Sequence, residues 1–187
     1  FSPVEGLLAF NAAEGPAFPG RPETVRLWRV ADRRFLPELA LGGPCLRLTF
    51  SPDGERLMIA SGEGELSLWR VADSRRLRTW HLPQMQRTGP VLVAPDFGVV
   101  AYGVDGGWLR VFDLATGELR WTARAAEELV TALAFSPNGR WLASGAGYVE
   151  SGIRLWDAMT GEMRARLEGH RTWVSSLQSE ERRVGKE

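Results

Sequence analysis

Residues that commonly carry catalysis or bind metals are sparse in this chain of 187 residues. It has two histidines, His81 and His170, and one cysteine, Cys45, all far apart in the sequence. A metal site needs several such ligands at suitable spacing. The chain also lacks a Gly-x-Ser-x-Gly nucleophile elbow and a phosphate-binding loop with Gly-Lys-Ser/Thr. We therefore expect no catalytic site, no metal and no cofactor.

Aromatic and charged residues between predicted strands are better candidates, and the chemistry they offer is binding of a protein partner. Large aromatic side chains and arginines are frequent anchors of protein interfaces, and loops on a rigid scaffold concentrate binding residues. We expect Trp108 and Trp173 to contribute most. The full set of candidates is Arg87, Asp105, Trp108, Glu127, Glu128, Tyr148, Glu150 and Trp173.

A repeated pattern predicts the elements that position these residues. One apolar-rich theme that ends in Trp or Phe occurs at 25–28, 66–69, 109–112 and 153–156. Its period of about 40–45 residues is typical of a β-propeller, in which each repeat is one blade. Phe-Ser-Pro-Asp-Gly at 50–54 and Phe-Ser-Pro-Asn-Gly at 135–139 keep the same phase and have the chemistry of tight turns. We expect the aromatic residues Trp28, Trp69, Phe112 and Trp156 to pack between blades.

Together these motifs resemble the WD-repeat (Trp-Asp repeat) family of β-propellers, over roughly residues 1–178. The resemblance implies an all-β chain of four-stranded antiparallel blades around a central channel. It implies three complete blades and two partial ones. Their expected bounds are about 1–41, 42–82, 83–124, 125–169 and 170–178.

The resemblance also implies a His–Ser–Trp–Asp hydrogen-bond network in each blade, which this chain completes nowhere. Ser61 and Ser144 match the serine of that network. Residues of other types stand where the family has His and Asp. These are Leu41, Gln84 and Ala126 at the His position, and Glu63 and Glu150 at the Asp position.

The two ends of the chain suggest a fragment. The first residue, Phe1, falls inside a repeat, and the repeat pattern stops after Leu177. Residues 179–187 resemble a translated sequencing-adapter tail, and they contain the only lysine, Lys186. We therefore expect 179–187 to be non-native, and we expect the isolated fragment to self-associate through exposed blade faces.

Composition limits the partners. The 23 basic residues balance the 23 acidic ones, so nothing favours nucleic acid or an anionic membrane surface. No apolar run is long enough for a transmembrane helix, and a single cysteine fits a reducing compartment such as the cytoplasm. The excess of Arg over Lys fits a GC-rich bacterial genome.

The predicted function is that of a non-catalytic scaffold that binds protein or peptide partners through its loop rim. An alternative is a sensor or regulatory propeller attached to a bacterial signalling enzyme such as a serine/threonine kinase. A more remote alternative is a quinoprotein dehydrogenase-like propeller. It is suggested by the segment around Trp121, because that family docks neighbouring blades through Gly–Trp pairs.

Overall fold

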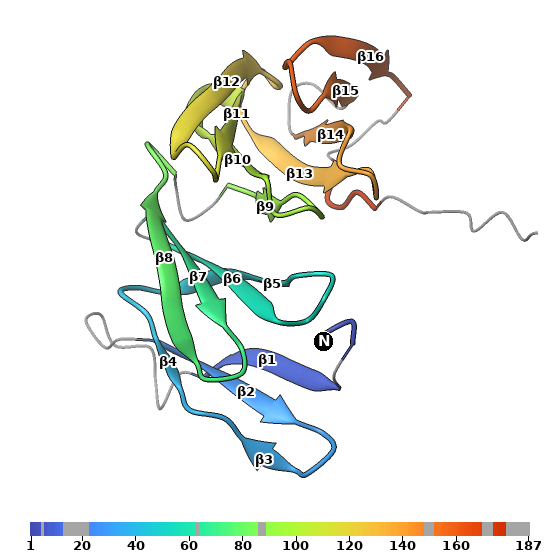
Figure 1. Cartoon of the computed structure of the whole chain (residues 1–187). Coiled ribbons are helices and arrows are strands. Elements are labelled where there is room, and N and C mark those ends of the chain that lie inside the picture. Colours follow the sequence, from blue (N-terminus) through green and yellow to red (C-terminus); the bar gives the residue numbers. More distant parts are fainter. Residues whose placement is uncertain are drawn as a thin grey trace, which may run out of the picture. The chain divides into compact units, whose positions relative to one another are not determined.

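The structure is a computed structural model that describes residues 1–4, 6–12, 23–62, 64–85, 89–147, 152–169 and 174–178. Within these ranges the chain is all-β, and its strands form four sheets of four antiparallel strands each (Figure 1). The predicted fold class of antiparallel four-stranded blades is confirmed. The chain divides into two compact units, Phe1–Arg87 and Thr88–Glu187, and each unit holds two sheets.

The first unit contains the first and second sheets. In the first sheet β2 pairs with β1 on one side and with both β3 and β4 on the other, so β3 and β4 act as one interrupted strand. The second sheet has the simple order β5-β6-β7-β8. The strands are β1 (Leu7–Ala12), β2 (Thr24–Arg29), β3 (Arg34–Phe35), β4 (Leu39–Ala40), β5 (Cys45–Phe50), β6 (Arg56–Ser61), β7 (Glu65–Arg70) and β8 (Arg75–His81).

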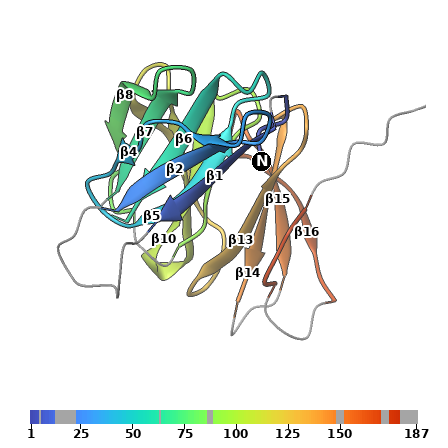
Figure 2. The same cartoon turned by 90° about the horizontal axis from the view of Figure 1, so that it is seen from below.

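The second unit contains the third and fourth sheets, in the orders β9-β10-β11-β12 and β13-β14-β15-β16. Figure 2 shows the strands of the fourth sheet running side by side. The elements are β9 (Val91–Val93), β10 (Val99–Val104), the 3-10 turn η1 (Asp105–Gly107), β11 (Trp108–Asp113), β12 (Glu118–Arg124), β13 (Val130–Phe135), β14 (Trp141–Ala146), β15 (Ile153–Asp157) and β16 (Met163–Leu167).

The Ser-Pro-Asp-Gly motif forms the predicted turn between β5 and β6. The N–H of Gly54 donates to the carbonyl of Ser51, and the N–H of Arg56 donates to Ser51 Oγ. Asp53 accepts from the Ser51 hydroxyl at 2.5 Å. This turn therefore satisfies its polar groups locally, as the residue types require.

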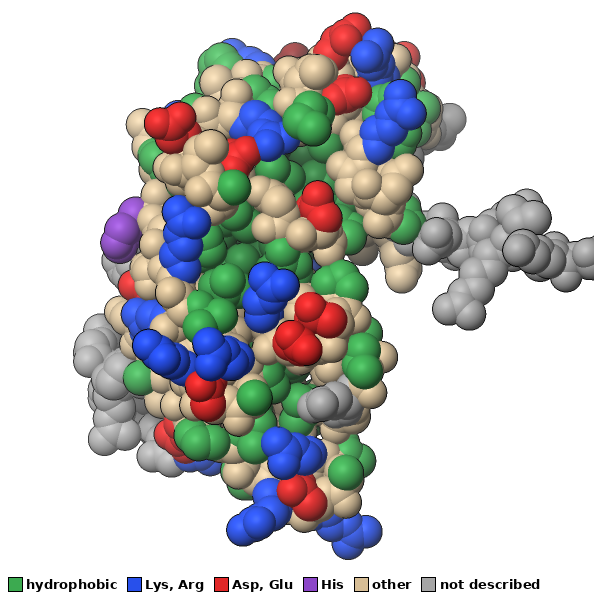
Figure 3. Space-filling model, in the orientation of Figure 1, with side chains coloured by type: hydrophobic (Ala, Val, Ile, Leu, Met, Phe, Trp, Pro, Cys, Tyr) green, Lys and Arg blue, Asp and Glu red, His purple; other side chains and the backbone are tan. Residues whose placement is uncertain are grey.

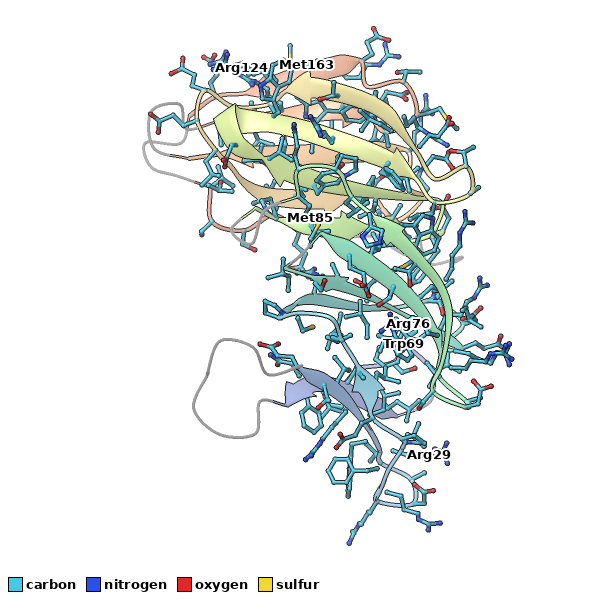
Figure 4. All side chains as sticks on the ribbon, turned by 90° about the vertical axis from the view of Figure 1, so that its left-hand side faces the viewer. Arg29, Trp69, Arg76, Met85, Arg124 and Met163 are labelled. Carbon is cyan, nitrogen blue, oxygen red and sulfur yellow. The ribbon has the colours of Figure 1, made fainter. Side chains whose placement is uncertain are left out.

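The core of the first unit lies between its two sheets. Trp69 of β7 is 6% exposed and belongs to one buried cluster with Leu7 and Leu27 of the first sheet. The guanidinium of Arg76 lies over the Trp69 ring, 4.7 Å from its centroid (Figure 4). Trp28 of the first sheet is only partly buried, and its ring contacts that of Phe35 at 4.6 Å between centroids. Packing of the repeated aromatic residue between sheets is thus confirmed for Trp69.

The third and fourth sheets share a second core. Trp156 of β15 is 4% exposed and clusters with Val111 and Ala125 of the third sheet and its following loop. Packing between sheets is therefore confirmed for Trp156 as well.

In the second, third and fourth sheets the pairing register shifts immediately before the repeated aromatic residue. Such a bulge increases the local twist of a strand pair.

A tryptophan–glycine contact joins the third and fourth sheets. The ring of Trp121 in β12 lies so close to Gly161 that a Cβ there would be 2.7 Å from a ring atom. The Trp121 Nε1–H donates to the carbonyl of Ala158 at 2.9 Å, and the ring stacks on Trp156 with 6.2 Å between centroids. The quinoprotein resemblance implied a contact of this kind. Here it packs the third sheet against the fourth.

The equivalence of Ser61 and Ser144 was wrong. Ser144 lies opposite Leu133 in the β13–β14 pair, and the residue that lies opposite Leu48 in the corresponding β5–β6 pair is Ile59. Ser61 lies two residues farther along, opposite Cys45. Only Ser144 therefore occupies the position from which a hydroxyl reaches the tryptophan of the next strand.

The expected start of a fifth blade is described only at 174–178, where no strand forms. The N–H of Val174 donates to the carbonyl of Ala146, and the hydroxyl of Thr131 donates to the carbonyl of Val174. The predicted tail at 179–187 lies outside the described residues. In the described part of the chain no helix is long and apolar enough to cross a membrane.

Candidate interaction surface on the third and fourth sheets

The turn η1 between β10 and β11 is joined to the loop that follows β12. The carbonyl of Gly107 accepts hydrogen bonds from the N–H groups of Ala125, at 2.9 Å, and Ala126, at 3.0 Å. A Cβ at position 107 would lie 2.1 Å from the Ala126 carbonyl oxygen, so only glycine permits this approach. The two loops at this end of the third sheet are therefore held together by backbone contacts.

Two predicted site residues lie at this junction. Asp105 is exposed in η1, and Trp108 begins β11 with 41% of its surface exposed. Trp108 pairs with Arg124 at the end of β12, so their side chains lie on the same face of the sheet. An indole that is half in water is the type of side chain that anchors protein interfaces.

Arg124 fixes the loop that carries the two predicted glutamates. Its Nη2 donates to the carbonyl of Glu127 at 2.9 Å, and its Nε donates to that of Ala126 at 3.4 Å. Glu127 and Glu128 are exposed, as expected for a loop between sheets. Their carboxylates are thus presented from a loop whose backbone is held in place.

A hollow of about 720 Å³ opens next to this loop. Arg154 of β15 reaches across it, and its Nη1 donates to the carbonyl of Arg124 at 3.0 Å. Arg166 of β16, the register partner of Arg154, also lines it. The lining residues are Arg124, Ala126, Glu127, Glu128, Arg154 and Arg166.

The structure thus brings Glu127 and Glu128 together with three arginines that sequence reasoning missed, Arg124, Arg154 and Arg166. Trp108 is joined to this group as the register partner of Arg124, and Asp105 lies in the turn that precedes Trp108. Acidic and basic side chains are interspersed on the face in view in Figure 3. The other four predicted site residues, Arg87, Tyr148, Glu150 and Trp173, lie outside the described residues.

Histidine and cysteine, the other residues with reactive side chains, offer no alternative site in the described part of the chain. It holds no cluster of three or more His, Cys, Asp and Glu side chains that could bind a metal ion. Burial, with the nearby Glu23 carboxylate, raises the pKa of Cys45 to about 11, so the thiol is protonated at neutral pH. His81 is exposed at the end of β8. The surface around Trp108 is therefore the candidate site.

Residues 117–157, which run from the end of the β11–β12 turn to the end of β15, match the family described as WD domain, G-beta repeat. The predicted resemblance to WD-repeat proteins is confirmed. The chain is also 30% identical, over 110 residues, to the small ribosomal subunit protein RACK1 of Caenorhabditis elegans. That alignment covers 58% of this chain and 32% of RACK1, so the chain matches about a third of the length of this relative.

The matched WD repeat includes a large part of the candidate surface, with Arg124, Glu127, Glu128 and Arg154. At the level of the family, the WD-repeat match and the likeness to RACK1 support a protein-interaction scaffold.

A second hollow, of about 430 Å³, lies on the same two sheets near the Pro-Asn-Gly turn. Arg120, Arg140, Asp157 and Met159 line it together with small residues. Arg120 there pairs with the Asp113 carboxylate. Of the predicted site residues that the structure describes, none lines this second hollow.

Proposed function

We propose that this chain is a non-catalytic protein-interaction scaffold that binds a segment of a protein partner at the rim made by Asp105, Trp108, Arg124, Glu127 and Glu128. The observation that carries the proposal is the position of Trp108. Its half-exposed indole lies beside an arginine that holds the charged loop, on two sheets that share one core.

The physical case rests on preorganisation. Arg124 and Gly107 hold the rim through three backbone carbonyls, so binding would order little additional chain and would cost little conformational entropy. Trp108 adds a large, rigid contact area, and residues of this type dominate the energetics of interfaces. The surrounding carboxylates and guanidinium groups supply directional hydrogen bonds at the edge of that contact.

The test is site-specific photocrosslinking followed by an affinity measurement. A photoreactive amino acid is placed at position 108 or at position 119 in the intact protein in cells. Leu119 is a matched control, because it is 42% exposed on the same strand pair but pairs with Phe112 near the other end of the sheet. We expect discrete protein adducts from position 108 and none from position 119.

For the partner so identified, Trp108→Ala is expected to weaken binding by more than about 1 kcal/mol with unfolding unchanged, and Leu119→Ala is expected to leave the affinity unchanged. Equal adducts from both positions, or an affinity that Trp108→Ala does not alter, would exclude this rim as the binding surface.

A further inference from the structure

Two arginines face each other across the β15–β16 pair. Arg154 and Arg166 are direct partners in the register, and both line the hollow beside the Glu127 loop. Like charges placed directly opposite on neighbouring strands destabilise a sheet. The fourth sheet therefore carries an unfavourable contact at the edge of the candidate surface.

The corresponding positions of the second and third sheets avoid this contact. Each position lies two residues before the repeated aromatic residue, and one further residue separates it from the register shift. In the second sheet Ser67 lies opposite Thr79, and in the third sheet Arg110 lies opposite Thr122. An arginine on the third strand of the sheet is thus compatible with the fold when threonine faces it. At this position the fourth sheet, unlike the second and third, has arginine on both strands. Arginines also lie opposite each other at Arg29–Arg34 and Arg70–Arg75.

The charges around the hollow indicate where an anion would lie. Arg124 and Arg154 both donate to backbone carbonyls. Arg166 pairs with Glu168 at 3.2 Å, but the Glu168 side chain is 75% exposed, and such a pair contributes little. Glu127 and Glu128 line the side formed by the loop. A negative group would therefore be attracted to the side formed by β15 and β16 and repelled from the loop.

We propose that Arg154 and Arg166 form a subsite that binds the carboxylate of an acidic residue in the protein partner. The planar guanidinium group matches a carboxylate through paired hydrogen bonds, and a carboxylate between the two arginines offsets their repulsion. The proposal rests on the proposed function, because Trp108 would anchor the same partner segment. It gives the chemistry of that partner: an acidic segment next to an apolar side chain.

The test uses a fluorescein-labelled peptide of six Glu-Ser repeats, and its Gln-Ser counterpart, with the full chain in a polarisation assay. We expect the Glu peptide to bind at least tenfold more tightly than the Gln peptide. Arg166→Thr places a threonine opposite Arg154, as in the Arg110–Thr122 pair of the third sheet. This variant should weaken binding of the Glu peptide at least tenfold. Arg164→Thr is the matched control, because Arg164 is exposed on the same strand and pairs with Glu162. It should change binding less than twofold.

A thermal melt of the same variants separates binding from folding. Because Arg166→Thr removes a like-charge contact, its melting temperature without peptide should equal or exceed that of the parent chain. A lower melting temperature would show that Arg166 stabilises the fold, which would overturn the proposal. Equal binding of the Glu and Gln peptides would also overturn the proposal. Full displacement of the Glu peptide by inorganic phosphate, at an equal concentration of charge, would overturn it as well, because it would indicate a site for free anions.

The two proposals fail in different ways. If the Glu peptide does not bind while position 108 still crosslinks to a partner, only the arginine subsite is refuted. If the peptide binds through Arg166 while position 108 yields no adducts, the proposed function of the rim is refuted instead.

Discussion

The repeated tryptophans of the second and fourth sheets, Trp69 and Trp156, satisfy their indole N–H groups with serines on different strands. In the second sheet Trp69 Nε1 donates to Ser67 Oγ, on its own strand, at 2.9 Å. In the fourth sheet Trp156 Nε1 donates to Ser144 Oγ, on the neighbouring strand, at 2.8 Å. A buried N–H must find an acceptor, but the fold leaves open which strand supplies it.

This choice determines what the position two residues before the tryptophan can do. In the second sheet that position is Ser67, which is buried and bound to Trp69. In the fourth sheet Ser144 takes over the hydrogen bond, and the position is occupied by Arg154 at the hollow. Where the neighbouring strand supplies the acceptor, as in the fourth sheet, the position two residues before the tryptophan can therefore carry a side chain that faces the hollow.

The turns after these two tryptophans also differ. Five residues beyond Trp69 stands Ser74, with φ 54°, and five beyond Trp156 stands Gly161, with φ 76°. Ser74 Oγ donates to the carbonyl of Pro37 in the first sheet, while Gly161 makes room for Trp121 of the third sheet. Each turn therefore contacts the preceding sheet, one through a hydroxyl and the other through the absence of a side chain.

The largest effect on stability is expected when Gly161, in the turn of the fourth sheet, is replaced by serine, the residue at the corresponding position of the second sheet. Gly161→Ser places a Cβ within the Trp121 ring and imposes a left-handed conformation on serine, so it should lower the free energy of unfolding by about 2–4 kcal/mol. Urea denaturation followed by tryptophan fluorescence measures this. The reciprocal variant, Ser74→Gly, loses a partly exposed hydrogen bond but relieves the strain of a positive φ at this position. The two effects oppose each other, so stability should change by less than about 0.5 kcal/mol. Equal effects of the two variants would show that the Trp121–Gly161 contact does not hold the sheets.

A smaller effect distinguishes the two serines that looked equivalent. Ser144→Ala leaves the Trp156 N–H buried without an acceptor and should cost about 1–3 kcal/mol. Ser61 is 3% exposed, and its hydroxyl has no partner among the described residues, so Ser61→Ala should be neutral or slightly stabilising. Denaturant titrations of both variants decide the matter. A Ser61→Ala variant as unstable as Ser144→Ala would contradict the corrected register.

The smallest expected effect is on the stability of the fold at acidic pH. The N–H of Thr116, together with the Arg120 side chain, holds the pKa of Asp113 at about 2, and the N–H of Thr160 lowers that of Asp157 in the fourth sheet. The second sheet has Arg70 at the corresponding position. A carboxyl group whose pKa is lowered by folding stabilises the fold at pH values above its pKa in the unfolded state, which is near 4. This stabilisation is lost as the pH falls towards the pKa in the folded state.

Between about pH 4 and pH 2 the Asp113 turn should therefore lose about 1 kcal/mol, limited by solvent screening. Asp113→Asn should flatten this part of the profile of stability against pH, measured by thermal melts. A variant that keeps the full acid sensitivity of the parent chain would assign that sensitivity to other carboxylates.

Much of the fold could be predicted from the sequence because its signals are local and repeated. The Phe-Ser-Pro-Asn-Gly turn at 135–139 requires specific backbone angles, and an apolar strand ending in Trp156 must be covered on both faces. The same reasoning placed Trp108 and Glu127 in loops. The structure has Glu127 exposed in the loop after β12, and Trp108 exposed as the first residue of β11.

The parts that could not be predicted depend on register. Ser61 and Ser144 share an Ala-Ser-Gly context, but their distances from the preceding Phe differ by two residues. The opposition of Arg154 and Arg166 depends on the shift between Leu155 and Trp156, which has no clear local signature. Sequence reasoning therefore selected Glu127 and Glu128, which line the hollow, but missed the three arginines that line it with them.

The stacked indoles of Trp121 and Trp156 also give the second unit an optical signature. Two indole rings with centroids 6.2 Å apart and planes inclined by 29° couple their electronic transitions and produce paired bands of opposite sign in circular dichroism. In the first unit the described aromatic contacts involve phenylalanine rings instead. Loss of the paired bands would therefore report separation of the third and fourth sheets while the first unit stays folded, without any added label.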